Sequence, residues 1–378
     1  DEQTHAKLNE LFNLLWDAKL QVGASIRTLQ ECLDIGKQEL SVATNMYEGR
    51  LLYGNAELWH RLVEALFQDD FWATPDFFQA KMAEKEERYA RYRNTSYNLE
   101  PDLKHSPGGL RDLHLVLWIM LRHYGARSFD ALFNKGLLFP EEYQELKQAG
   151  NVLFRMRFAL HTQLKRYDNR LRFDRQLQLS ELLGYHGEGN QPVEAMMRTF
   201  FQATQSISQL SQLLLNSVKQ YVLGLQNSAE KQPLDEHFYL QNQQIAVENH
   251  RVFAKQPETI LDLFCHLTQH PEWQVDPMTL RHLRIALQKR QQPLCELPEA
   301  RSRFIQIIQQ PQMVKNAIVP MHQLGVLAAY FPAWQGITGL MQFDMFHIYT
   351  VDEHTVRVML KLESFLDEQT KTIHPLCH

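Results

Sequence analysis

The chain has 378 residues, of which 44% are hydrophobic and 22% charged, a composition typical of a soluble globular protein with two or more domains. Its formal net charge of -5 argues against a general nucleic-acid binder, because such proteins usually carry a basic surplus. The four cysteines are scattered, no stretch is long and apolar enough to span a membrane, and no signal peptide is recognisable, so we expect a cytoplasmic protein with free thiols and no membrane anchor.

The first expected element is a strand over residues 17–22, where apolar and polar residues alternate. Asp17 and Lys19 would share the face of this strand that points away from the core. A carboxylate in that position could hold Mg²⁺ for phosphoryl transfer. The alternative is a surface carboxylate paired with a cation, and the residue types alone favour it.

Helix signals dominate the next hundred residues. Thr28 followed by Glu31 forms a capping box, and Asn55 is a second helix cap. A charged helix is predicted over about 76–93, followed by a loop over 94–109 that prolines interrupt. The helix that Asn55 begins is expected to bury three leucines at helical spacing, namely Leu58, Leu62 and Leu66.

The middle of the chain predicts a helical bundle. Two apolar stripes with a 3.6-residue period indicate long helices, the second longer than the first. Residues 226–233 are polar and predict a linker, after which short helical segments are separated by prolines. A last helix is expected over about 343–365. The stripes are formed by Leu153, Met156, Leu160 and Leu164, and by Val193, Met196, Phe200, Ile207, Leu214, Val218 and Tyr221.

The junction between the 94–109 loop and the next helix is the best local candidate for a site. Gly108 and Gly109 could let backbone N–H groups face outward before the helix that resumes at about Arg111, which would suit a phosphate. Arg111 adds a forked cation, and Lys104 and the Tyr97-Asn98 pair could line the same pocket. The alternative is a simple glycine turn between two helices, and a short glycine motif leaves both open.

His354 is the candidate metal ligand near the end of the chain. Val351 and Val358 share its helical face, and a histidine on an apolar stripe is more often a core residue than a ligand. The sequence contains no H-E-x-x-H motif, no Walker loop and no G-x-S-x-G elbow, so these enzyme classes are not indicated.

Several strings, spread along the chain in order, resemble the P-II uridylyltransferase/uridylyl-removing enzymes. The clearest are TSYNLEPDLK and SPGGLRD, which flank one histidine in the 94–112 region. Matches over strings of this length do not arise by chance. The full set covers residues 15–20, 25–28, 95–104, 106–112, 166–171, 173–177, 341–344, 346–347 and 349–355.

The resemblance implies a mainly α fold in which a helical bundle follows a small α/β remnant of a nucleotidyltransferase palm. It also implies that the first helix of a His-Asp-type (HD-type) all-α hydrolase domain lies at the C-terminal end, and that two glutamine-sensing domains are absent. The expected division is 1–60 for the rear of the palm, 61–225 for the helical domain, 226–335 for a linker and helical segment, and 336–378 for the start of the hydrolase domain.

The resemblance also implies the chemistry. The transferase would move UMP from UTP to a tyrosine of P-II with Mg²⁺, the hydrolase would remove it with a divalent metal of unknown identity, and glutamine would regulate both. Asp17 would match the third metal carboxylate of the transferase. Gly108, Gly109 and Arg111, with Lys104, would lie near the nucleotide, and His354 would match the first metal histidine of the hydrolase.

The departures from the family pattern predict an internal fragment that is inactive by itself. The chain opens with Asp1 rather than Met, no Asp-x-Asp pair precedes Asp17, and no His-Asp doublet follows His354. Two alternatives stay open: a relative of the adenylyltransferase of glutamine synthetase, and a non-catalytic helical module that binds a partner such as P-II.

Overall fold

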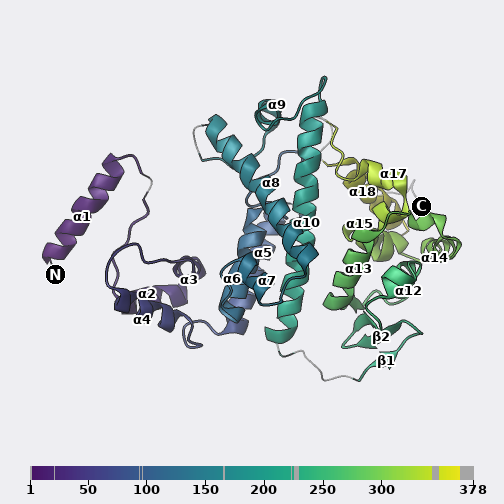
Figure 1. Ribbon diagram of the computed structural model, residues 1–378, viewed down its shortest axis with the longest axis horizontal. Coiled ribbons are helices and arrows are strands. Elements are labelled where there is room, and N and C mark those ends of the chain that lie inside the picture. The colour runs from purple at the N-terminus through teal and green to yellow at the C-terminus, as the bar shows by residue number, and fades with distance from the viewer. Residues whose placement is uncertain are drawn as a thin grey trace. The chain divides into compact units, whose positions relative to one another are not determined.

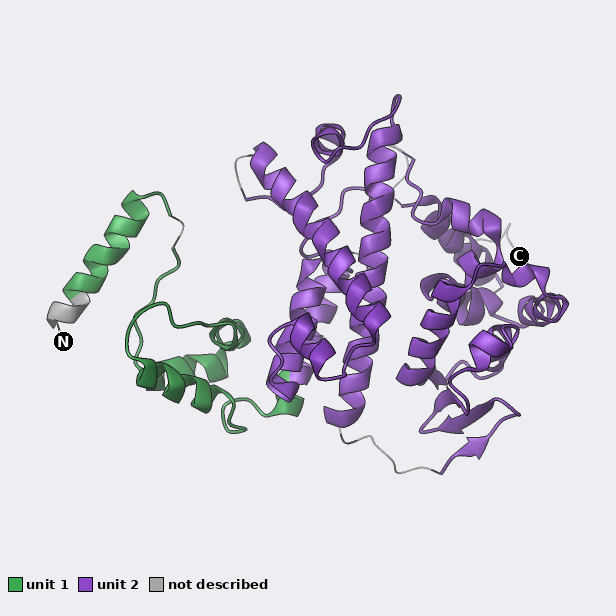
Figure 2. Cartoon of the chain, in the orientation of Figure 1, with its two compact units in different colours: residues 1–77 green, residues 78–378 purple. Residues whose placement is uncertain are grey.

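The computed structural model describes residues 2–20, 22–92, 94–95, 97–164, 167–222, 224, 230–342 and 349–366. It divides into two compact units, residues 1–77 and residues 78–378 (Figure 2). Most of the described residues are helical and the strands form one small sheet (Figure 1), which confirms the mainly α fold.

The helices are α1 (Glu2–Asp17), α2 (Leu29–Gln38), α3 (Leu40–Tyr47), α4 (Ala56–Leu66), α5 (Thr74–Arg91), α6 (Leu110–Tyr124), α7 (Phe129–Asn134), α8 (Pro140–Leu164), α9 (Phe173–Leu182), α10 (Gln191–Val222), α11 (Val252–Lys255), α12 (Thr259–Gln269), α13 (Pro277–Lys289), α14 (Pro298–Ile308), α15 (Val319–Gln323), α16 (Val326–Tyr330), α17 (Pro332–Ile337) and α18 (Val351–Ser364). A 3₁₀ turn, η1 (Leu294–Glu296), and a π-helical turn, η2 (Val314–Ile318), join them. The strands are β1 (Gln232–Pro233), β2 (Phe238–Gln241), β3 (Gln244–Val247) and β4 (Gln274–Val275).

Both predicted caps of the first unit are confirmed. The Thr28 hydroxyl accepts a hydrogen bond from the Glu31 amide at 3.2 Å, and the Glu31 carboxylate accepts one from the Thr28 amide at 2.7 Å. Asn55 caps α4 through the Leu58 amide, but the expected burial is only partly right, because Leu66 is buried whereas Leu58 is 52% exposed.

The strand expected over residues 17–22 is wrong. Asp17 is the last residue of α1, and Lys19 has a left-handed backbone with φ of 63°. Residue 21 lies outside the described residues, and residue 22 has no regular structure. A strand needs a neighbour to satisfy its backbone groups, and no strand occurs in the described part of the first unit. The described residues with the alternating pattern therefore form the end of α1 and the turn that follows it.

The bundle predicted for the middle of the chain is confirmed. Its core lies between α6, α8 and the 32-residue α10, which stand side by side in Figure 1. The α10 stripe is buried from Val193 to Val218, whereas Tyr221 is 56% exposed. In α8, the predicted positions are buried up to Leu160, and Leu164 is only partly buried. A single long helix thus carries the apolar face on which the bundle is built.

The sequence reasoning did not predict the sheet. Its strands follow the bundle in the chain, after the end of α10. Strands β2 and β3 form an antiparallel hairpin, flanked by β1 on one side and by a parallel β4 on the other. Asn242 and Gln243, the two turn residues, both have left-handed φ values of 52° and 59°, as a two-residue type I′ hairpin requires. The signal in the sequence was two short β-prone runs separated by two polar residues.

Ion pairs tie α13 to the start of α8. The Arg281 guanidinium pairs with the Glu142 carboxylate, and both side chains are less than a tenth exposed. Arg284 pairs with Glu145 one turn further along α13. Because buried charges hold their positions only when they are paired and hydrogen-bonded, these contacts fix the segment after the sheet against the bundle.

Candidate functional site

The Gly-Gly junction is organised by a carboxylate that the sequence reasoning left without a role. Asp112, in the first turn of α6, is fully buried. Its two oxygens accept hydrogen bonds from the Gly108 amide at 2.6 Å, from Arg88 Nη2 at 2.5 Å and from Tyr89 Oη at 2.6 Å. The Asp112 carboxylate therefore supplies the negative charge that stabilises the positive N-terminal end of the α6 dipole.

The neighbouring amides are also used inside the protein. The Gly109 amide donates to the Ser106 carbonyl at 2.8 Å, and the Arg111 amide donates to the Lys104 carbonyl at 2.8 Å. The expectation that these amides face outward and cradle a phosphate is therefore wrong. The physical reason is that Asp112 supplies the anion that the junction stabilises.

The glycines are needed for packing. Gly108 has φ of 74°, and a Cβ atom there would lie 2.2 Å from the Thr204 carbonyl oxygen of α10. A Cβ on Gly109 would lie 2.8 Å from the Ser106 carbonyl oxygen. The Gly-Gly pair thus lets the 94–109 loop approach the backbone of the central helix closely.

Lys104 faces the loop between α8 and α9. Its Nζ lies 3.1 Å from Tyr167 Oη, and Arg157 of α8 lies over the same ring, 5.3 Å from its centre. Tyr167 is 59% exposed. The hydrogen bond from Asn169, helped by Lys104 and Arg157, lowers the pKa of the Tyr167 phenol to about 8.

Neither Lys104 nor Arg157 has a carboxylate within ion-pair distance in the described part of the chain. The two cations meet only neutral groups: the Tyr167 hydroxyl and, for Arg157, the Asn169 side-chain oxygen at 2.8 Å. Two partly exposed cations that lack a counter-charge among the described residues and lie next to one tyrosine suit an anionic ligand.

Arg111 has different neighbours and does not share this site. Its guanidinium lies 5.2 Å from the centre of the Trp118 ring, in a narrow cleft with Lys81, Lys85 and Arg88 of α5. The structure thus separates two residues, Lys104 and Arg111, that the sequence placed in one pocket. Tyr97 borders a third region, a partly open cavity beside α10 and α13.

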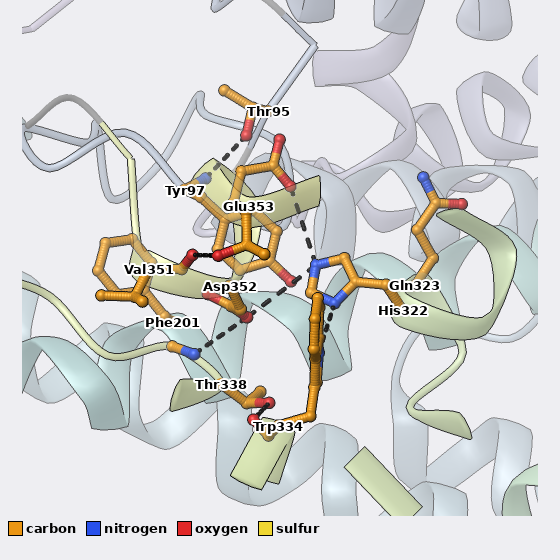
Figure 3. A network of polar contacts seen from close by, with 12 residues as sticks. Thr95, Tyr97, Phe201, His322, Gln323, Trp334, Thr338, Val351, Asp352 and Glu353 are labelled. Carbon is orange, nitrogen blue, oxygen red and sulfur yellow. Dashed lines mark hydrogen bonds and ion pairs between the residues drawn. The ribbon is translucent and has the colours of Figure 1, made fainter. Parts of the chain in front are cut away.

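His354 lies on the exposed side of α18, so the core alternative does not hold for it. The neighbouring Asp352 and Glu353 instead face a polar network with His322 of α15 (Figure 3). The His322 Nε2 atom lies 4.0 Å from an oxygen of Asp352 and 3.9 Å from one of Glu353. Burial lowers the pKa of His322, although both carboxylates oppose this shift.

Asp352 is fully buried and accepts a hydrogen bond from the Gly339 amide at 3.1 Å, while Trp334 Nε1 lies 3.4 Å from His322 Nδ1. The network therefore joins the start of α18 to α15 and α17. No motif in the sequence marked His322, because its partners come from an element about thirty residues away.

The metal ligands expected from the sequence do not come together in the described residues. Among them, no group of three or more His, Cys, Asp or Glu side chains could hold a metal ion. Asp17 is exposed at the end of α1, and His354 is exposed on α18. The described residues by themselves therefore complete neither a Mg²⁺ site at Asp17 nor a metal site at His354.

Comparison with known proteins identifies two family matches. The family described as GlnD PII-uridylyltransferase matches residues 76–215, and that described as Uridylyltransferase GlnD third domain matches residues 238–330. The first match covers α6, α8 and most of α10, and the second covers β2, β3, β4 and the helices up to α16. No solved structure matches the chain.

Curated relatives match almost the whole chain. Bifunctional uridylyltransferase/uridylyl-removing enzymes from Haemophilus influenzae (strain PittEE), Pasteurella multocida and Vibrio cholerae are 51%, 49% and 44% identical to it over 372, 377 and 377 residues. These alignments cover 98%, 100% and 100% of this chain, and 43%, 44% and 43% of the relatives. The chain thus spans less than half the length of the relatives it matches.

Proposed function

Because the chain belongs to the family of bifunctional uridylyltransferase/uridylyl-removing enzymes, we propose that it forms part of an enzyme that transfers UMP from UTP to a tyrosine of P-II and later removes it by hydrolysis. The observation that carries this proposal is 51% identity over 372 residues to a protein of that name. The proposal includes control by glutamine and a cytoplasmic location. No helix of the described residues has the length and apolar character needed to cross a membrane.

The relatives' names favour this function over the two alternatives, a glutamine synthetase adenylyltransferase and a non-catalytic module. Mg²⁺ in the transferase and a divalent metal in the hydrolase belong to the proposal, with Asp17 and His354 as contributing ligands. The described residues by themselves assemble neither site.

For the nucleotide we propose a division of labour within the 104–112 region. Lys104, with Arg157 and the Tyr167 hydroxyl, would bind phosphate oxygens of UTP, since these cations lack counter-charges among the described residues. Gly108 and Gly109 would hold the turn that presents Lys104, rather than donate their amides to the ligand. Arg111 would contact the nucleotide from the separate cleft beside Trp118.

A chimaera tests the function. These residues would replace the matching 372-residue span of the Haemophilus influenzae relative, and P-II would be incubated with UTP and Mg²⁺. We expect the intact mass of P-II to rise by one uridylyl group with the chimaera and to stay unchanged with the 378-residue chain alone, because Asp17 has no acidic partners in the described structure.

Two results would contradict these expectations. Transfer by the chain alone would show that its own residues complete a catalytic site. A chimaera that folds, by circular dichroism and gel filtration, but leaves P-II unmodified while the unaltered relative modifies it, would refute the proposed function for this chain.

The phosphate contact should depend on pH through Tyr167. With a pKa of about 8, the phenol is neutral at pH 7 and mostly anionic at pH 9, so UTP affinity should fall as the pH rises through 8. One added negative charge about 4 Å from a phosphate costs about 1 kcal/mol in water, which is roughly a fivefold weaker binding. Isothermal titration calorimetry at several pH values measures this change.

Two variants complete the test. Tyr167→Phe should remove the pH dependence between pH 7 and 9, and Lys104→Met should weaken UTP binding at every pH. The matched control is Tyr53→Phe, because Tyr53 is 98% exposed and lies in the first unit. If Tyr167→Phe kept the pH dependence, the phosphates would bind elsewhere.

A further inference from the structure

A partly open cavity of about 350 Å³ lies where three parts of the second unit meet. Its walls come from the loop before α6, from α10 of the bundle, from α13 and the end of α15, and from the first turn of α18. The first two belong to the segment that matches one family description, and α13 and α15 to the segment that matches the other. Small-molecule sites often lie at such boundaries and usually start at about 300 Å³.

The polar groups that face this cavity without a partner are neutral. Tyr97, Gln205 and Ser208 line it, and none of their side chains has a hydrogen bond to any described residue. Asn94 adds a fourth neutral side chain. Partly buried groups of this kind gain most from a ligand that offers both donors and acceptors.

The two charged groups at the cavity are already neutralised. Arg284 pairs with Glu145 and also bonds to the Gln209 side chain. Glu353 pairs with Arg357 at 2.7 Å and faces His322, as Figure 3 shows. A phosphate here would meet the carboxylate of Glu353 and no free cation, so the cavity favours an uncharged ligand.

The remaining walls suit a flat ring. Leu280 and Leu283 of α13, and leucines from α10 and the turn after α15, give the cavity apolar sides. A side-chain amide carries a donor and an acceptor on one edge and can pair with a ring imide, while hydroxyls of Tyr97 and Ser208 can reach sugar hydroxyls. A pyrimidine nucleoside combines these features, and uridine is the one that a uridylyl-transferring enzyme handles.

We propose that this cavity is a binding site for the neutral uridine moiety, separate from the phosphate contact at Lys104. The choice of uridine rests on the proposed function. Because its walls come from the bundle, from the segment after the sheet and from α18, a bound nucleoside contacts all three at once. Binding therefore favours the arrangement in which the three parts are closed on one another.

The test measures direct binding to the 378-residue chain. Uridine, which carries no phosphate, is titrated by calorimetry, and 5-iodouridine is photocrosslinked and its attachment site is located by mass spectrometry. Gln205→Leu should weaken uridine binding at least tenfold. Gln202→Leu is the matched control, since Gln202 lies on the exposed face of the same helix and should leave binding unchanged.

Tyr97→Phe removes one hydroxyl and keeps the ring that packs beside Phe201, so it tests the site even if Gln205→Leu disturbs folding. It should weaken uridine binding several-fold, and Lys104→Met should not change uridine binding.

The 5-iodouridine crosslink should be found on residues that line the cavity. The proposal is overturned if uridine shows no saturable binding up to millimolar concentration, or if both cavity variants bind it as the unaltered chain does. A failure of the P-II modification assay alongside normal uridine binding would instead count against the proposed function.

Discussion

Replacing Asp112 with alanine is expected to destabilise the bundle by about 3–5 kcal/mol, because it removes one partner of a buried ion pair. The carboxylate is fully buried and accepts hydrogen bonds from the Gly108 amide, from Arg88 and from Tyr89. Without it, the buried Arg88 guanidinium keeps the hydrogen bond to the His105 carbonyl oxygen, at 2.9 Å, and the contact with the Tyr89 ring, but its charge has no carboxylate partner.

The measurement is urea denaturation followed by circular dichroism. With m values of about 1–3 kcal/mol/M, the midpoint should fall by about 1 M or more. Asp174→Ala is the control, because Asp174 also lies in the first turn of a helix but its side chain is 74% exposed, so its loss should change stability by less than about 0.5 kcal/mol. Equal midpoints for the two variants would show that Asp112 does not hold the junction together.

Asp112 also shows why the role of the Gly-Gly junction could not be predicted from sequence. The helix start and its position were correct, because they depend on residues next to each other in the chain. The direction of the amides was wrong, because it depends on Arg88 and Tyr89, which come from a helix more than twenty residues earlier. A glycine turn before a helix is compatible with an external phosphate and with an internal carboxylate, and only the fold decides between them.

Local signals predicted local structure well elsewhere. The Thr28 capping box and the long α10 stripe were confirmed, since each depends on spacing within one helix. The strand over 17–22 failed because a strand needs a partner, and alternation in one segment does not supply one. The β2–β3 hairpin was missed although its two-residue turn carries Asn242, a residue that tolerates a left-handed backbone.

The region of α18 illustrates the same limit for site residues. His354 was predicted as a ligand, whereas the buried groups are Asp352, two positions earlier, and, in part, Glu353, one position earlier. Successive residues of a helix point about 100° apart, so neighbouring positions in one string have opposite environments. Asp352 and Glu353 face inward toward His322. That contact could not be predicted, because His322 lies on α15 and comes near α18 only in the folded chain.

The second large effect is expected for Gly108→Ala. Gly108 has φ of 74°, and a left-handed backbone costs a residue with a Cβ atom about 1–2 kcal/mol. The new Cβ atom would also lie 2.2 Å from the Thr204 carbonyl oxygen and 2.8 Å from its carbon. These are backbone atoms inside α10 and cannot turn aside as a side chain could, so the loop and the helix must separate, which adds about 1–3 kcal/mol of packing strain.

Gly136→Ala distinguishes the cost of the left-handed backbone from the cost of packing strain. Gly136 has nearly the same φ, 72°, but a Cβ atom there would meet nothing within 4 Å. Its substitution should therefore cost only the backbone term of about 1–2 kcal/mol, whereas Gly108→Ala should cost about 2–5 kcal/mol in the same urea titration. Gly108→Ala should also increase hydrogen exchange in the first turn of α6, because the Gly108 amide would move away from Asp112. If the two glycine variants unfolded at the same urea concentration, the close approach of the 94–109 loop to α10 would not be what requires glycine at position 108.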